Sequence, residues 1–249
     1  MRQTTLCGGL MGRNKITEGT REWAEQNVNC YSGCSHDCLY CYAKFMAIRY
    51  NRKTEETWSI MEPTKTVQKG WKYHSDMRFM FPSTHDITPE TVQTCLKVLL
   101  KLLNPGNRVL IVSKPHFEVI KLLCKKLAFC INRIEFRFTI TSDNDQLLSY
   151  WEPNAPTFEE RLAALRFAAQ KGFKTSLSIE PFLDPDPVPL FTLLTKATEG
   201  EIWIGPMNYY NHNEIYAPPN LQRIYDQLIE YPQVRFKDAF INTMEGRRL

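Results

Sequence analysis

The stretch Gly33-Cys34-Ser35-His36-Asp37-Cys38-Leu39-Tyr40-Cys41-Tyr42 places three cysteines within eight residues, spaced C-x3-C-x2-C. No regular helix or strand directs all three side chains at one point, so we expect a loop that wraps a bound group. Thiolates that converge this closely prefer a soft metal ion or an iron–sulfur cluster. The stretch therefore predicts a metal centre with Cys34, Cys38 and Cys41 as its ligands.

The number of cysteines helps to separate the kinds of metal centre. Structural zinc sites close with four ligands, usually from two separated pairs, and ferredoxin-type clusters also use four cysteines. Three cysteines on a four-iron cluster leave one iron open to a substrate or cofactor. Two alternatives stay open, namely a zinc site completed by His36 or Cys30, and three unrelated buried thiols.

The wider string NCYSGCSHDCLYCYAK, residues 29–44, resembles the signature of radical S-adenosylmethionine (SAM) enzymes, in which an aromatic residue precedes the third cysteine. It is most similar to the branch of spore photoproduct lyase and its "DNA repair photolyase" relatives, with the motif N-P-Y-x-G-C-x-H-x-C-x-Y-C-Y-A-R/K. One departure is Cys30, which stands where these relatives usually carry proline. The string WEPNAPTFEERL, residues 151–162, resembles a stretch after their fourth strand. The resemblance covers about residues 26–205.

Composition sets broad limits on the class of protein. At 249 residues the chain fits one barrel-type domain or two small ones, and 43% hydrophobic residues are ordinary for a globular protein. The net charge of +4, from 31 basic and 27 acidic residues, permits an acidic or nucleic-acid substrate without indicating one. No apolar run approaches the roughly 20 residues of a membrane span. Without a signal-peptide core, we expect a cytoplasmic protein with reduced cysteines.

Hydrophobic patterning predicts strands that alternate with helices of ordinary length, which implies a parallel sheet with right-handed crossovers. The expected strands lie at about 25–31, 77–81, 108–112, 134–140, 173–179 and 201–204. Six such units match the α/β fold that the resemblance implies, a partial (β/α)6 TIM-type barrel with the cysteine loop after its first strand. We expect an N-terminal arm (1–24), the barrel (25–230, with an insertion at 51–75) and a C-terminal tail (231–249).

Polar side chains follow the expected strands at their carboxyl ends, where parallel barrels collect function. Given the resemblance, Lys114 suits the carboxylate of SAM, Ser83 or Thr84 its ammonium group, and Thr141 and Ser142 its ribose. Structural alternatives stay open, since Lys114 also suits a solvated loop and Arg161 also suits a pair with Glu152 or Glu160. The candidate cofactor-binding residues are Tyr40, Ser83, Thr84, Ser113, Lys114, Thr141, Ser142, Glu152, Arg161 and Glu180.

The resemblance implies a radical SAM enzyme, either a lyase or an oxidoreductase. A [4Fe-4S] cluster on three cysteines would cleave SAM reductively, and the resulting 5′-deoxyadenosyl radical would abstract hydrogen from a substrate. It also implies an electron donor such as flavodoxin or ferredoxin, and we expect a monomer.

The substrate stays open among nucleic acids, peptides and small molecules. Phe81 and Pro82 stand where spore photoproduct lyase has its hydrogen-donating cysteine, which argues against thymine-dimer repair. Cys30 at the barrel mouth is one alternative hydrogen donor. Whether Cys7 has this role also stays open. The competing class is a non-catalytic zinc- or iron–sulfur-binding interaction module.

Overall fold

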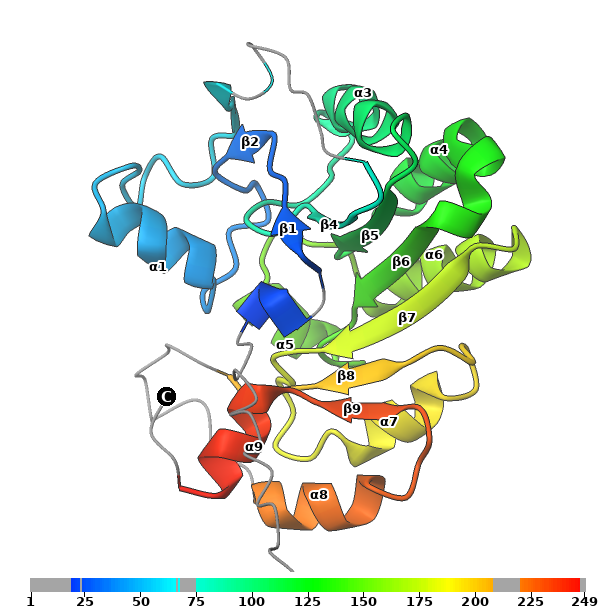
Figure 1. Cartoon of the computed structure of the whole chain (residues 1–249). Helices are drawn as coiled ribbons and strands as arrows, with labels where there is room; N and C mark the ends of the chain where they lie inside the picture. Colours follow the sequence, from blue (N-terminus) through cyan, green and yellow to red (C-terminus); the bar gives the residue numbers. More distant parts are fainter. Residues whose placement is uncertain (1–18, 23, 66, 68–74, 208–219, 247–249) are drawn as a thin grey trace, which may run out of the picture.

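The computed structural model describes residues 19–22, 24–65, 67, 75–207 and 220–246. In this part of the chain, a parallel sheet of seven strands curls into a half-barrel (Figure 1). Every pair of neighbouring strands is parallel. The expected partial TIM-type barrel is thus confirmed. In spatial order the strands are β1 (Gln26–Asn27), β4 (Arg78–Phe81), β5 (Arg108–Ser113), β6 (Ile134–Thr139), β7 (Lys174–Ile179), β8 (Ile202–Ile204) and β9 (Val234–Phe236).

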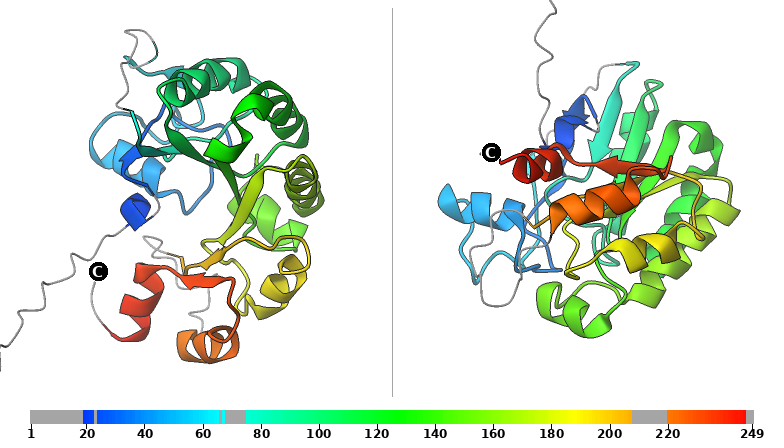
Figure 2. Two further views of the ribbon diagram at one scale, coloured as in Figure 1. Left: turned by 45° about the vertical axis from the view of Figure 1, so that its right-hand side comes forward. Right: turned by 90° about the horizontal axis from the view of Figure 1, so that it is seen from below.

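Helices follow the strands and form an outer layer around the curled sheet (Figure 2). This layer contains α3 (Val92–Leu103), α4 (Phe117–Leu127), α6 (Phe158–Gln170), α7 (Val188–Leu194) and α8 (Leu221–Leu228). The remaining helices are α1 (Tyr42–Arg49), α5 (Asp145–Trp151), α9 (Asp238–Met244) and the 3-10 helices η1 (Gly19–Glu22) and η2 (Ala128–Arg133). Across the described ranges, none of the helices has the length and apolar character needed to cross a membrane.

The strand count is one higher than the six predicted. The segment expected as a tail supplies β9, which pairs with β8 through Trp203 and Arg235, and α9 follows it directly. Val234 is buried, but three residues are too short for the alternating pattern that predicts a strand. The tail therefore extends the sheet by one β/α unit.

The beginning of the barrel is also shorter than predicted. Within the expected first strand, only Gln26 and Asn27 pair with the main sheet, as β1. Tyr31 and Ser32 form β2, which pairs antiparallel with β3 (Glu62–Pro63) in a separate two-stranded sheet. The expected insertion at 51–75 thus packs beside the cysteine loop, although residues 66 and 68–74 lie outside the described part.

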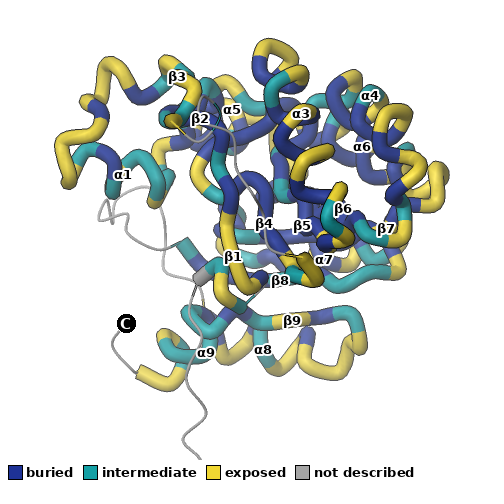
Figure 3. Tube along the Cα trace, turned by 45° about the horizontal axis from the view of Figure 1, so that its top comes forward, coloured by how far each residue is buried: buried dark blue, intermediate teal, exposed yellow. Residues whose placement is uncertain are grey.

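The two faces of the main sheet differ in chemistry, and this difference creates the site. On β6, Ile134, Phe136 and Phe138 pack in the large apolar core under the helices, whereas the alternate residues face the inside of the half-barrel. Buried residues accordingly run along the strands of the sheet (Figure 3). The inner face carries the polar groups Glu135, Arg137 and Thr139, so the half-barrel encloses a polar interior.

Candidate active site

The cysteine loop is held against its neighbours by backbone contacts at both ends. Gly33 has φ +91°, and the next amide, that of Cys34, donates to the carbonyl of Trp58 at 3.0 Å. A Cβ at Gly33 would lie 2.4 Å from the carbonyl oxygen of Ile60, so glycine is required there. Farther along, the amide of Leu39 donates to the carbonyl of Trp151 at 2.9 Å. The loop is therefore fixed both to the 51–63 segment and to the end of α5.

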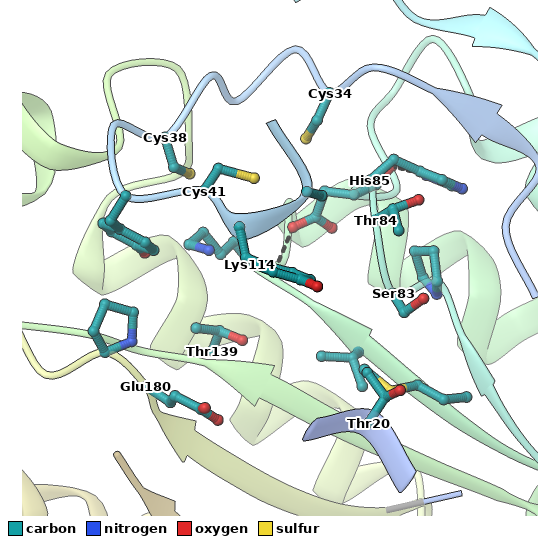
Figure 4. A pocket seen from close by; sticks show the side chains of 18 of the residues that line it. Thr20, Cys34, Cys38, Cys41, Ser83, Thr84, His85, Lys114, Thr139 and Glu180 are labelled. Carbon is teal, nitrogen blue, oxygen red and sulfur yellow. Dashed lines mark hydrogen bonds between the residues drawn. The ribbon is translucent and has the colours of Figure 1, made fainter. Parts of the chain in front are cut away.

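All three predicted cysteines line one cavity of about 660 Å³ inside the half-barrel. Figure 4 shows Cys34, Cys38 and Cys41 at one end of this cavity, with Thr139 and Glu180 toward the other. Burial raises the pKa of Cys34 to about 12, with Asp86 adding to the effect, and burial also raises the pKa values of Cys38 and Cys41. A bound cationic centre is what would convert such thiols into thiolates at neutral pH.

The donor set of the loop can be compared with what each metal centre needs. Among the described side chains of histidine, cysteine, aspartate and glutamate, no group of three or more is placed to hold a single metal ion. A zinc ion draws all of its sulfur ligands to about 2.3 Å from one point. A [4Fe-4S] cluster instead takes each thiolate at a different iron. The three thiols at one end of the cavity could each bind a different iron of such a cluster.

The predicted cofactor-binding residues divide into two groups. Six residues line the cavity, and the other four are buried outside its lining. The lining residues are Tyr40, Ser83, Thr84, Ser113, Lys114 and Glu180. Thr141, Glu152 and Arg161 form one buried network, which is called the wall here. Ser142 is also buried, and its hydroxyl accepts the Asn144 amide at 3.0 Å.

Glu152 is the centre of the wall, and its side chain is fully buried. Its carboxylate accepts hydrogen bonds from Arg161 Nη2 at 2.5 Å, from Thr141 Oγ1 at 2.9 Å and from the Tyr40 hydroxyl. Burial raises the pKa of Glu152, but Lys114 and Arg161 outweigh this effect and lower it overall. Arg161 thus makes the pair with Glu152 that the sequence offered as an alternative, and Tyr40 ties this pair to the cysteine loop.

Lys114 joins the wall to the cavity. Its Nζ lies 3.8 Å from Glu152 Oε1 and 5.5 Å from the centre of the Tyr40 ring, and its side chain is 15% exposed. Burial lowers the pKa of Lys114, but the nearby Cys38 and Glu152 outweigh burial and raise it overall. Lys114 is therefore a cation on the cavity surface beside the cysteine loop.

Asp86 and His36 form a second buried network, and neither is among the predicted cofactor-binding residues. Asp86 accepts hydrogen bonds from the Ser113 hydroxyl and from the Lys114 amide at 2.7 Å. Its Oδ2 lies 3.3 Å from His36 Nδ1, and His36 Nε2 lies 3.0 Å from His116 Nε2. Burial raises the pKa of Asp86, but His36 and Ser113 lower it overall. Asp86 thus connects the cysteine loop to the end of β5. In the sequence, its position directly after Ser83-Thr84-His85, at the end of a predicted strand, was the signal that could have marked it as a site residue.

Asn29 positions the turn that carries Ser83 and Thr84. Its Oδ1 accepts the amides of Ser83 at 2.7 Å and Thr84 at 3.0 Å, and its Nδ2 donates to Ser83 Oγ at 2.9 Å. These bonds fix the backbone and one hydroxyl on the cavity surface. The resemblance included Asn29 in its motif, but its role as an anchor appears only in three dimensions.

The end of the cavity away from the cysteines carries charged groups from both ends of the described chain. Glu22 of η1 pairs with Lys237, which follows β9, at 2.9 Å, and both side chains are nearly buried. Glu180, at the end of β7, lies beside Lys237, and a Cβ at Gly205 would meet both side chains within 3.1 Å. Burial raises the pKa of Glu180, and Lys237 offsets part of this increase. The expected arm thus lines the cavity through η1, while residues 1–18 and 23 lie outside the described part.

Comparisons with known proteins find related sequences of unassigned role. No protein-family model matches the chain. An uncharacterized protein of Acidianus two-tailed virus is 27% identical over 197 residues, which are 74% of this chain and 62% of that protein. An uncharacterized protein of Methanocaldococcus jannaschii is 28% identical over 167 residues, which are 66% of this chain and 62% of that protein. The chain thus matches less than two thirds of the length of these relatives.

Comparisons with solved structures identify the fold. Spore photoproduct lyase complexed with dinucleoside spore photoproduct superposes with a TM-score of 0.56 at 19% identity, over 90% of this chain and 66% of that chain. A spore photoproduct lyase variant with bound AdoMet and dinucleoside spore photoproduct has a TM-score of 0.55 at 19% identity, over 84% of this chain and 61% of that chain. The chain therefore has the partial-barrel fold of spore photoproduct lyase, with three cysteines of one loop at one end of its cavity.

Proposed function

We propose that the chain is a radical SAM enzyme that holds a [4Fe-4S] cluster on Cys34, Cys38 and Cys41. The observation that carries this proposal is the position of the three thiols. They come from one loop and line a single cavity together with Ser83, Thr84 and Lys114. The similar fold of a lyase with bound AdoMet supports the same assignment.

The residues of this chain would bind and orient SAM. Lys114 offers a cation for a carboxylate, and Ser83 and Thr84 offer hydroxyls for an ammonium group on a turn that Asn29 fixes. Ser113 would hold Asp86, and Ser142 would shape the turn at Asn144. Thr141, Glu152 and Arg161 would act from the wall, where Glu152 and Arg161 neutralise each other. Glu180 and Thr139 face the far end, where a substrate would lie.

When bound, the cluster and SAM would supply one-electron cleavage to a carbon radical that abstracts hydrogen, as the cofactor carries the hard chemistry. The protein would place the reacting carbon, because residues of the half-barrel, the cysteine loop and η1 line the same cavity. The substrate determines whether the overall reaction is that of a lyase or of an oxidoreductase. We propose that the substrate is a nucleic acid, a peptide or a small molecule.

The proposal includes an external electron donor such as flavodoxin or ferredoxin, a monomeric protein and a cytoplasmic location. An oxygen-sensitive cluster suits a reducing compartment, in which cysteines stay free. In the described part of the chain, all seven cysteines are free.

The proposal is tested by anaerobic reconstitution of the full chain with iron and sulfide. We expect a brown protein with about four irons per chain. With dithionite as reductant, this protein should convert SAM to 5′-deoxyadenosine and methionine, measured by chromatography and mass spectrometry. A colourless protein that retains one zinc ion and leaves SAM intact would instead support the non-catalytic metal-binding module.

A further inference from the structure

Cys30 and Cys95 lie side by side in the core, although 65 positions separate them in sequence. Their Sγ atoms are 3.5 Å apart, and both residues are fully shielded from solvent. Cys30 precedes the cysteine loop, whereas Cys95 lies on α3. The sequence left open a position for Cys30 at the barrel mouth, but Cys30 is absent from the described residues that line the cavity. The structure therefore places Cys30 in a thiol pair rather than among the groups that meet a substrate.

One histidine separates this pair from the cavity. The amide of Cys30 donates to His85 Nε2 at 3.1 Å, so Nε2 is unprotonated and Nδ1 carries the proton, which it donates to the Asp86 carbonyl at 2.9 Å. The Sγ of Cys30 lies 3.7 Å from the same Nε2. Because His85 lines the cavity, a small molecule there is one imidazole ring away from the thiols.

The surroundings of Cys30 also favour its reactive form. The Cys95 thiol, as a hydrogen-bond donor, lowers the pKa of Cys30 overall, against burial, which raises it. A thiol with a lowered pKa holds a larger share of the nucleophilic thiolate. Cys124 gives a contrast within the same chain, because burial raises its pKa to about 12.

We propose that Cys30 and Cys95 form an oxidation site that closes to a disulfide with a peroxide and reopens with a dithiol. The Cys30 thiolate attacks one oxygen of hydrogen peroxide, and the O–O bond breaks. The hydroxide that leaves takes up the proton that the Cys30 thiol released, so a sulfenic acid and water result. The Cys95 thiol then attacks that sulfur, the S–S bond forms, and a second water leaves. The two thiols are oxidised and the peroxide is reduced. The sulfur atoms need only move from 3.5 Å to about 2.0 Å.

The disulfide would act on the cavity through two contacts. Asn29, next to Cys30, holds the backbone of Ser83 and Thr84, and the Cys30 amide holds His85. A shift of Cys30 toward α3 would therefore displace the turn that carries these three residues.

The site is tested by treating the reduced full chain with hydrogen peroxide, blocking free thiols in denaturant, and digesting it with trypsin. Trypsin leaves Cys95 as the lone cysteine in residues 79–97, whereas residues 22–44 contain Cys30 with the three loop cysteines. The triple variant Cys34→Ala, Cys38→Ala and Cys41→Ala leaves only Cys30 in that second peptide. We expect a cross-link between the two peptides in both proteins, located at Cys30 by fragmentation in the wild type and reversed by dithiothreitol.

The controls separate this site from the proposed cluster and from unfolding. The cross-link should persist in Cys124→Ser, and it should form in the triple variant, so its outcome does not depend on the proposed function. The proposal would be overturned if Cys30 became a sulfinic acid while Cys95 stayed free, or if Cys95 stayed free while partly exposed methionines such as Met46 and Met61 were oxidised. A cross-link from Cys30 to Cys124 or Cys130 would also overturn it, because such pairing arises only in unfolded chains.

Discussion

Arg161 Nη2 lies 2.5 Å from Glu152 Oε2, and both side chains are fully buried. Such a pair is costly to break, because removing one partner leaves an uncompensated charge away from water. The pair also lies directly behind the cysteine loop, since Glu152 accepts the Tyr40 hydroxyl. It therefore couples the stability of the barrel to the position of the loop.

Substituting Arg161→Met should lower the free energy of unfolding by about 3–5 kcal/mol, measured by urea denaturation. The matched control is Arg223→Met, because Arg223 and Asp186 also lie 2.5 Å apart but are 54% and 37% exposed. That change should cost less than about 1 kcal/mol. Equal losses in the two variants would contradict the role assigned to burial.

Substitution by alanine should lower the stability of the protein by very different amounts at two glycines that have nearly the same backbone conformation. Gly33 and Gly106 have φ of +91° and +92°, but a Cβ at Gly106 meets no atom within 4 Å. Gly106→Ala should cost about 1–2 kcal/mol for the left-handed conformation. Gly33→Ala should cost more, on the order of 3 kcal/mol or above, because the backbone at Ile60 must move. Thermal or urea unfolding compares the two, and a Gly33→Ala variant no less stable than Gly106→Ala would refute the close approach.

Asn29→Ala should weaken cofactor binding as well as stability. The change leaves the amides of Ser83 and Thr84 without their acceptor, which costs about 1–3 kcal/mol. The control is Asn220→Ala, which removes the N-terminal cap of α8 and should cost about 1 kcal/mol away from the cavity. Isothermal titration with SAM should show weaker binding for Asn29→Ala but not for Asn220→Ala. If both variants bound SAM equally weakly, the cause would be a general loss of stability and not the displaced turn at Ser83 and Thr84.

Alanine at each loop cysteine should abolish the brown colour of the reconstituted protein, measured as visible absorbance and bound iron. Cys34→Ala, Cys38→Ala and Cys41→Ala each remove one of three ligands. Cys124→Ala, a buried cysteine of α4 outside the cavity, should retain the iron. If all four variants lost iron equally, the loss would report general misfolding.

Glu180 should make stability depend on pH. Burial raises the pKa of Glu180 above its ordinary value, so the folded chain binds this proton more tightly than the unfolded chain does. The resulting stabilisation is fully present below the unfolded pKa and is lost as the pH rises through the folded value. The free energy of unfolding of the wild type, relative to Glu180→Gln, should therefore fall as the pH rises from about 4. A difference that stays constant with pH, or that rises, would exclude a raised pKa.

Much of the fold was predictable because its signals are local. The strands β4–β7 are continuous apolar or alternating runs of four to six residues, and the sequence predicted each within about two residues. The N-cap of α6 is equally local, because the Thr157 side chain accepts the Glu160 amide at 3.3 Å, only three residues away. Strand β9 was missed because three residues carry too little pattern.

The candidate site was predictable only in part, because strand-end position does not determine the direction of a side chain. Ser83, Thr84 and Lys114 follow strands and line the cavity, whereas Thr141 follows β6 and turns to Glu152. The contact between Cys30 and Cys95 joins segments 65 positions apart, and no periodicity within either segment indicates it. Long-range pairs of this kind are set by tertiary packing, which a single sequence does not specify.

The ion pair between Glu22 and Lys237 has a consequence for how the protein is made. Thr20 and Ala239, which lie far apart in the sequence, both line the cavity. A nascent chain in which Ala239 has not yet left the ribosome therefore lacks one side of that cavity. The proposed cluster would thus enter a complete cavity only after these two segments have met.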